Sequence, residues 1–256
     1  MVDGIISPHF FSIRIVEGWL FGNLVDIVYR ATPIAIVALG MAIVLGIQPI
    51  IATLILMVSG RGIGLMINLI YGANPSFESP FLQGLSTGHI GLIPTRIFIG
   101  LGLGLALWAL TRRTAFGLFL EAVGSNPRAA RLAGVEARAI RIAAYLVCGF
   151  MAAAAGVILT ADTHTSDPVS VGLYIELDAI LAVVIGGGSL NGGRVYLAGA
   201  ALGAVVIQAL TTSILTSGLP PEYNLVVKAA AVLVVLLLQS ANFRLAAAGF
   251  VRGRRR

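Results

Sequence analysis

Long apolar segments separated by short polar ones dominate the pattern of this chain. The apolar segments cover residues 31–47, 50–71, 97–110, 142–161, 177–185, 196–216 and 225–239. A helix needs about 20 such residues to cross the hydrocarbon layer of a bilayer. The segments are uniformly apolar and do not alternate with polar positions, which favours helices over a membrane β-barrel. The pattern predicts an all-α, polytopic transmembrane helical bundle with about six or seven membrane elements, one of them short or broken.

Proline and glycine predict local features of these spans. We expect Pro33 in the first turn of the span 31–47, where its missing N–H costs nothing. Residues 60–62, Gly-Arg-Gly, predict an interruption of the span 50–71. Gly100 and Gly104 are spaced four residues apart, which lets two membrane helices approach closely.

Composition excludes an ordinary soluble domain. Of 256 residues, 58% are hydrophobic and 11% are charged, and the mean hydropathy is +0.97. Soluble domains carry about 25% charged residues, because their surfaces must face water.

The net charge of +6 is concentrated in segments that adjoin apolar spans. Arginines gather in residues 111–141 and 242–256, whereas residues 72–94 and 162–176 contain no Lys or Arg. This distribution indicates cytoplasmic segments beside anionic lipid, and not a nucleic-acid-binding surface. We predict an interfacial N-terminal segment 1–30 that starts outside the cell. A single transmembrane domain 31–241 with a cytoplasmic loop 111–141 and a basic cytoplasmic tail 242–256 would follow.

The loop 111–141 contains signals for a short helix. Asn126 is a good N-cap, Pro127 suits the first helical position, and Gly134 can end the helix in the left-handed conformation. So short a helix is not stable alone. Two interpretations remain open: a capped connector packed on its own spans, or a helix that fits a partner's groove with Arg128 and Arg131 at its rim.

Polar residues near the segment 177–185 also have two interpretations. Glu176 and Asp178 suit a helix N-terminus, or they stand at the exterior mouth of a pathway for a polyhydroxylated solute. The glycines at 186–188 permit a backbone break beside that pathway, or a tight turn for close packing. The segment 177–185 is too short to cross alone and predicts a broken or re-entrant element.

Three further polar residues lie in or near the last two spans. Gln208 and Thr211 either face the pathway or bond within the helix and to neighbours. Lys228 is expected to extend its ammonium to the exterior interface.

The sequence carries no catalytic motif, so we expect no enzyme, no metal and no cofactor. It has no paired-histidine metal motif, no Gly-x-Ser-x-Gly and no phosphate-binding Gly-x-x-x-x-Gly-Lys-Ser/Thr loop. Any ATP would be hydrolysed by a separate subunit. A stand-alone channel or secondary transporter would show buried charge pairs and an inverted repeat, neither of which is visible in the sequence.

Several motifs in order along the chain resemble permease subunits of bacterial ABC sugar importers of the ribose, xylose and galactofuranose type. They are residues 48–54 (QPIIATL), 121–134 (EAVGSNPRAARLAG), 176–193 (ELDAILAVVIGGGSLNGG) and 218–222 (GLPPE). The last of these and 19–22 (WLFG) are most similar to galactofuranose permeases.

The resemblance implies a multi-pass protein of the bacterial inner membrane. Its partners would be cytoplasmic ABC ATPase subunits, a second permease subunit in a homo- or heterodimer, a periplasmic sugar-binding protein and membrane lipid, with no nucleic acid. The residues implied to couple to the ATPase are Glu121, Gly124, Ser125, Asn126, Pro127, Arg128, Ala129, Arg131 and Gly134. The pathway candidates are Glu176, Asp178, Gly186, Gly187, Gly188, Gln208 and Thr211.

Two departures from the family pattern are visible. The family chain begins with a span before the region that matches residues 8–10, and here only residues 1–7 precede it. The family also continues after residues 40–45 into a Gly-Gly-Ile-Asp-Leu-Ser-Val-Gly-like motif and further spans, whereas here Gly46 leads directly into Ile47. We therefore expect the first span and an internal helix pair to be missing, and a non-transporting remnant is an alternative to a working permease.

Overall fold

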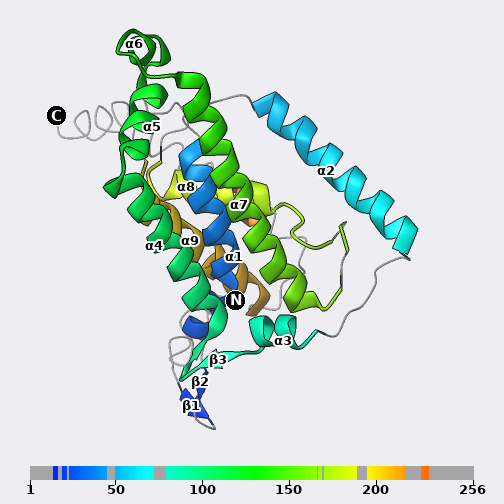
Figure 1. Cartoon of the computed structure of the whole chain (residues 1–256). Coiled ribbons are helices and arrows are strands. Elements are labelled where there is room, and N and C mark those ends of the chain that lie inside the picture. The colour runs from blue at the N-terminus through cyan, green and yellow to red at the C-terminus, as the bar shows by residue number, and fades with distance from the viewer. Residues whose placement is uncertain are drawn as a thin grey trace, which may run out of the picture.

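The computed structural model describes residues 14–16, 19–21, 23–44, 50–71, 79–165, 167–168, 170–188, 195–216 and 226–230. These residues form a helical bundle with two small antiparallel hairpins (Figure 1). The elements are β1 (Arg14–Val16), β2 (Trp19–Phe21), α1 (Asn23–Val44), α2 (Ile50–Tyr71), α3 (Pro80–Ser86), β3 (His89–Ile90), β4 (Ile93–Pro94), α4 (Thr95–Arg113), α5 (Ala115–Ser125), α6 (Pro127–Leu132), α7 (Ala137–Thr163), α8 (Ile175–Ile185) and α9 (Leu197–Thr216). The predicted all-α class is confirmed. Residues 226–230 are helical, and the rest of the expected span 225–239 and the tail 242–256 lie outside the described residues.

Helix α1 is the centre of the bundle. It packs against α4, α7, α8 and α9, and Ile36, Ala38 and Ile43 on it are almost fully buried. Figure 1 shows α1 enclosed by these helices. The core therefore sits around the first long helix, and the later helices surround it.

The predicted start of this first span is wrong. Helix α1 begins at Asn23, so Pro33 lies inside the helix and not in its first turn. An ion pair between Asp26 and Arg30, four residues apart, supports the additional turns. A proline is tolerated inside a membrane helix because neighbouring groups satisfy the backbone that it leaves unpaired.

Helix α4 packs closely on α1 through its glycines, as predicted. A Cβ atom added to Gly100 would lie 2.6 Å from Cγ2 of Thr32, and one added to Gly104 would lie 3.4 Å from Cδ1 of Leu39. Only a glycine permits the first of these approaches. The spacing of small residues thus fixes the α1–α4 contact.

Helix α2 runs beside the bundle and stands apart from most of it (Figure 1). It is continuous from Ile50 to Tyr71, so the predicted interruption at residues 60–62 is wrong. A glycine inside a helix costs only about 1 kcal/mol relative to alanine, and the long apolar segments on both sides carry the helix through. The apolar side chains of Met66, Leu69 and Ile70 are exposed.

Helices α8 and α9 form a pair with backbone contact. A Cβ atom on Gly186 would lie 2.2 Å from the backbone of Gly199, and one on Gly203 would lie 1.9 Å from the carbonyl oxygen of Ala182. The 11 residues of α8 extend only about 16 Å, which confirms the prediction of an element too short to cross alone. Helix α8 lies against α1 and α9, where protein surrounds its ends.

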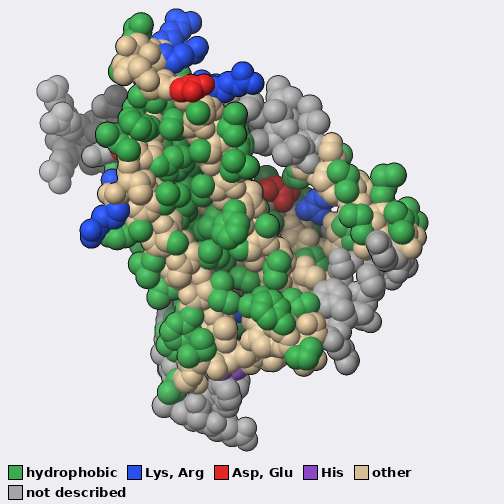
Figure 2. Space-filling model, in the orientation of Figure 1, with side chains coloured by type: hydrophobic (Ala, Val, Ile, Leu, Met, Phe, Trp, Pro, Cys, Tyr) green, Lys and Arg blue, Asp and Glu red, His purple; other side chains and the backbone are tan. Residues whose placement is uncertain are grey.

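Among the described residues, four helices are long and apolar enough to cross a membrane. They are Leu24–Val44, Thr95–Arg113, Ala137–Thr163 and Leu197–Ile214. Helices α4 and α7 are the least buried of the four, and Figure 2 shows hydrophobic side chains over the outer face of the bundle. Exposed apolar surface of this extent is typical of helices that face lipid.

Candidate functional site

The short helix α6 forms as its flanking residues predict. The side chain of Asn126 accepts hydrogen bonds from the backbone N–H groups of Arg128 and Ala129, at 3.0 and 3.1 Å. Pro127 occupies the first turn. The N-cap prediction is therefore confirmed.

The other end of α6 closes with two backbone hydrogen bonds around a left-handed glycine. Gly134 has a φ of 84°, and its N–H donates to the carbonyl of Arg131, while the N–H of Val135 donates to the carbonyl of Ala130. This pattern is a Schellman motif, which pairs carbonyls that the helix end would otherwise leave open. The predicted role of Gly134 is confirmed.

One face of α6 docks on the chain itself. Ala130 is 5% exposed and packs with Val123 of α5 and Ala137 of α7, and Val135 and Ile140 pack around this group. The cluster holds a helix of six residues that would not be stable alone. This contact matches the first interpretation, a capped connector packed on its own spans.

The opposite face of α6 is open. Leu132 is 91% exposed, and Arg128, Ala129 and Arg131 are also exposed. Figure 1 places α6 at one extremity of the molecule, and Figure 2 shows basic side chains gathered there. We call this extremity the basic end. The outer face of α6 therefore exposes one large apolar side chain, Leu132, on the same short helix as the exposed arginines Arg128 and Arg131.

The first coupling candidates lie on a separate helix. Glu121, Gly124 and Ser125 belong to α5, whereas Pro127, Arg128, Ala129 and Arg131 belong to α6. Much of the predicted loop 111–141 is helical, because Thr114 caps α5 by accepting a hydrogen bond from the N–H of Phe116 at 3.2 Å and the residues after it are apolar.

Glu121 points toward α9. Its Oε1 accepts a hydrogen bond from the backbone N–H of Val195 at 3.3 Å. A guanidinium nitrogen of Arg112 lies 4.0 Å from the same oxygen, and Arg112 also donates to the carbonyl of Val195 at 3.5 Å. Two charged side chains thus hold the backbone just before α9.

Asp178, near the start of α8, forms a buried ion pair. The ammonium of Lys228 lies 2.8 and 2.7 Å from the two carboxylate oxygens of Asp178, and the two side chains are only 11% and 15% exposed, in that order. The expectation that Lys228 extends to the membrane interface is wrong, because the partner that it finds 50 residues away in sequence keeps it inside.

Glu176 pairs with the central arginine of α2. Its carboxylate lies 3.8 Å from the guanidinium of Arg61, which also donates to the carbonyls of Pro168 and Gly172 at 3.2 and 3.4 Å. Figure 2 shows acidic and basic side chains in the recess between α2 and the bundle. Glu176 and Asp178 both lie in the first turn of α8, as their helix N-terminal interpretation predicts.

The other pathway candidates make local contacts. Gly186, Gly187 and Gly188 form a tight turn after α8, with Gly187 at a φ of 85° and the N–H of Gly188 bonded to the carbonyl of Val183. Gln208 donates to Thr212 at 3.5 Å, and Thr211 donates to the carbonyl of Ile207 at 3.0 Å. These contacts match the packing and helix-internal interpretations; a pathway role for these residues stays a prediction.

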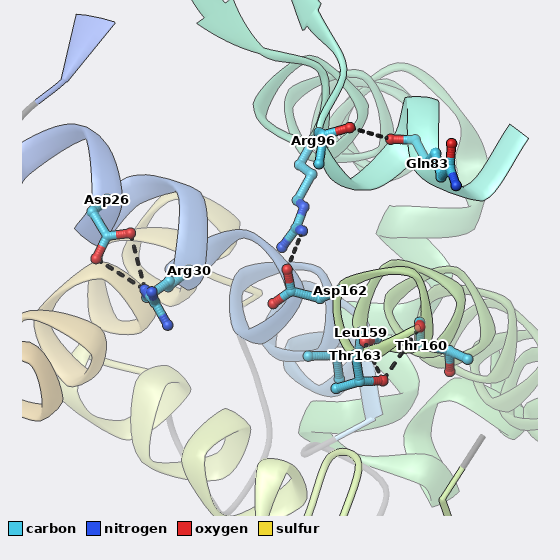
Figure 3. A network of polar contacts seen from close by, with 9 residues as sticks. Asp26, Arg30, Gln83, Arg96, Leu159, Thr160, Asp162 and Thr163 are labelled. Carbon is cyan, nitrogen blue, oxygen red and sulfur yellow. Dashed lines mark hydrogen bonds and ion pairs between the residues drawn. The ribbon is translucent and has the colours of Figure 1, made fainter. Parts of the chain in front are cut away.

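A buried arginine that sequence reasoning did not single out joins three helices. Arg96 of α4 is 1% exposed, and its guanidinium donates to the carboxylate of Asp162 on α7 and lies 3.9 Å from the ring centroid of Tyr29 on α1. Figure 3 shows Arg96 pointing toward Asp162. Separation in the sequence hides such pairs, although an arginine at the edge of an apolar span is itself a signal.

Comparison with protein families decides which kind of membrane protein this is. A family described as "Branched-chain amino acid transport system / permease component" matches residues 43–236. That match covers most of the chain. The protein belongs to this permease family.

Several similar proteins are permeases of sugar transport systems. The galactofuranose transporter permease of Escherichia coli K12 is 40% identical over 95% of this chain and 87% of the relative. The fructose import permease of Bifidobacterium longum is 37% identical over 82% of this chain and 60% of the relative. The ribose import permease of Escherichia coli K12 is 32% identical over 76% and 61%. No solved structure shows significant similarity.

These relatives and the membrane-length helices confirm a multi-pass permease of the bacterial inner membrane. The alignment with the galactofuranose permease spans 298 positions, more than the 256 residues of this chain. The relative therefore carries internal residues that this permease lacks, in agreement with the expected internal deletion.

Proposed function

We propose that this permease is the membrane-spanning subunit of an ATP-driven importer for a monosaccharide such as ribose, xylose or galactofuranose. Its partners would be two cytoplasmic ABC ATPase subunits, a second permease subunit and a periplasmic sugar-binding protein. The names of the relatives support the sugar class. The absence of a phosphate-binding loop from the sequence is the reason to place ATP hydrolysis in a separate subunit.

The burial of α6 on one face and its exposure on the other carry the proposal. Its inner face is fixed by Ala130, while Ala129 and Leu132 stand outside. If α6 were only a connector between α5 and α7, the contact of its inner face with Val123 and Ala137 would be sufficient. An exposed leucine at a basic extremity suits a groove on a partner that has an apolar floor and an acidic rim.

Movement of α6 would reach the membrane helices through α5. Glu121 and Arg112 fasten α5 and α4 to the backbone at Val195, and α9 packs on α8 and α1. When ATP binding closes the ATPase subunits on α6, this route would shift α9 and the polar residues of α8.

The polar recess beside α2 is the proposed place of solute contact. Arg61 and Glu176 are each about three-quarters buried, and at 3.8 Å their pair is loose. An arginine and a carboxylate can donate to and accept from neighbouring sugar hydroxyls. Glu176→Gln and Arg61→Gln should each raise the sugar concentration that gives half-maximal uptake, with little change in ATPase co-purification.

Two alternatives have observations of their own. The internal deletion favours a remnant that no longer transports, and the buried pair Asp178–Lys228 favours a stand-alone transporter. Proteoliposomes that contain the permease with its ATPase and binding protein distinguish the three. Our proposal requires sugar uptake that depends on ATP; ATP-independent uptake supports the stand-alone transporter, and no uptake supports the remnant.

The coupling role is tested with a matched pair of exposed alanines near the basic end. Ala129→Trp places a large ring on the outer face of α6, and Ala139→Trp places one on α7, where Ala139 is also exposed. We expect only the first to abolish ATPase co-purification and uptake. Equal behaviour of the two variants would remove α6 from the coupling role.

A further inference from the structure

A long apolar groove lies between α1, α4 and α9. It has a volume of about 390 Å³, in the range of pockets that hold small molecules. Glycines and alanines form part of its wall, among them Gly100, Gly104, Ala198 and Ala201. Because α4 is the least buried of the membrane-length helices, the groove faces the surroundings of the bundle.

Two arginines of α4 follow the lining residue Trp108 at one end of the groove. Trp108 of α4 lines it, and the guanidinium of Arg113 lies 5.6 Å from the ring centroid of Trp108. Arg112, also on α4, donates to the carbonyl of Val195, two residues before Leu197, which lines the groove from α9. Both arginines are exposed, and Trp108 is about half exposed.

This combination has the two parts that a phospholipid requires. The apolar groove matches an acyl chain, and the exposed guanidinium groups at its end match a negative headgroup. The tryptophan lies between them, at the position where aromatic side chains mark the edge of the hydrocarbon layer. Arg112 also faces Glu121 at 4.0 Å and the carbonyl of Val195, whereas the described contact of Arg113 is with the ring of Trp108. A neutral lipid would therefore fill the groove but offer no negative group to the guanidinium of Arg113.

We propose that this groove is a binding site for an anionic phospholipid, with one acyl chain along α4 and the headgroup at Arg112 and Arg113. The site is on the surface of the bundle, separate from α6 and from the recess beside α2. It does not depend on which solute, if any, the permease carries.

Trp108 provides the probe for the test. The chain has two tryptophans, so Trp19→Phe leaves Trp108 as the only one. The purified full-length variant is reconstituted in nanodiscs that contain a fixed fraction of phosphatidylglycerol or phosphatidylcholine with brominated acyl chains, and quenching of Trp108 fluorescence is measured. We expect an apparent preference for the anionic lipid of about fivefold for each arginine engaged, weakened by high salt.

Three variants in this background locate the effect. Arg113→Gln should reduce the preference about fivefold, and Ala198→Phe should reduce quenching by both lipids because its ring fills the groove. Arg138→Gln, at an exposed arginine of α7 that does not line the groove, should leave the preference unchanged.

The remaining outcomes overturn the proposal. Equal quenching by both lipids would mean that the groove accepts acyl chains without headgroup selection. Absence of quenching would mean that protein, either a second copy or another part of this chain, fills the groove. Loss of the preference in Arg138→Gln as well as Arg113→Gln would show a diffuse attraction to basic surface.

Discussion

Glu121 on α5 accepts a hydrogen bond from the backbone N–H of Val195, which immediately precedes α9, at 3.3 Å. The two residues are 74 positions apart in the chain. This bond joins α5 to the backbone that leads into α9, so it links the basic end to the α8–α9 pair, in addition to the direct packing of α6 on α7 through Ala130 and Ala137.

Removing this link should weaken both stability and coupling. In Glu121→Ala the N–H of Val195 and the charge of Arg112 lose their shared partner, which costs about 1–3 kcal/mol. We expect thermal unfolding in nanodiscs a few degrees lower, and less stimulation of the ATPase by sugar-loaded binding protein. Glu136→Ala is the control, because Glu136 is exposed and its side chain makes no capping bond to α7.

The sequence predicted α6 better than any other element because its signals are local. Asn126, Pro127 and Gly134 each act on backbone within four residues, and the structure shows both caps. Proline and glycine are weaker signals for the start of α1 and the continuity of α2, because the helix continues through Pro33 and through Gly60 and Gly62.

The ion pairs were not predictable in the same way. Arg61 meets Glu176, Arg96 meets Asp162 and Lys228 meets Asp178 across long stretches of chain. The sequence shows only that each of these six charged residues lies in or near an apolar span. Pairing depends on how the helices are placed in the bundle, which no local pattern contains.

Neighbouring alanines in α6 should respond oppositely to enlargement. Ala130→Trp forces a ring into the cluster with Val123 and Ala137, where overpacking costs about 1–3 kcal/mol. We expect a lower unfolding temperature for Ala130→Trp, measured by intrinsic fluorescence or calorimetry. Ala129→Trp, on the exposed face, should unfold at the unchanged temperature, and equal destabilisation of both would contradict the docked orientation of α6.

The α8–α9 contact should not tolerate a methyl group. In Gly203→Ala the new Cβ would lie 1.9 Å from the carbonyl oxygen of Ala182, so the helices must separate. We expect the unfolding temperature to fall by ~5–10 °C. Gly156→Ala in α7 serves as the matched control, because its Cβ meets nothing within 4 Å and alanine favours the helix.

The buried pair of Asp178 and Lys228 should matter most when only one partner is removed. Lys228→Met leaves the carboxylate of Asp178 buried without its cation, a loss of about 3–5 kcal/mol. Trypsin digestion and thermal unfolding should report a strongly destabilised protein. The double variant Asp178→Asn, Lys228→Met should recover much of the loss; a double variant as unstable as the single one would argue against direct pairing.

The central claim, that α6 faces the cytoplasm for contact with an ATPase, can be measured at Leu132. A cysteine in place of this highly exposed residue, in a Cys148→Ser background that removes the native cysteine, is treated with a membrane-impermeant maleimide. We expect labelling in inverted membrane vesicles and none in intact spheroplasts. Labelling in intact spheroplasts would place α6 outside the cell, where it could not contact a cytoplasmic ATPase.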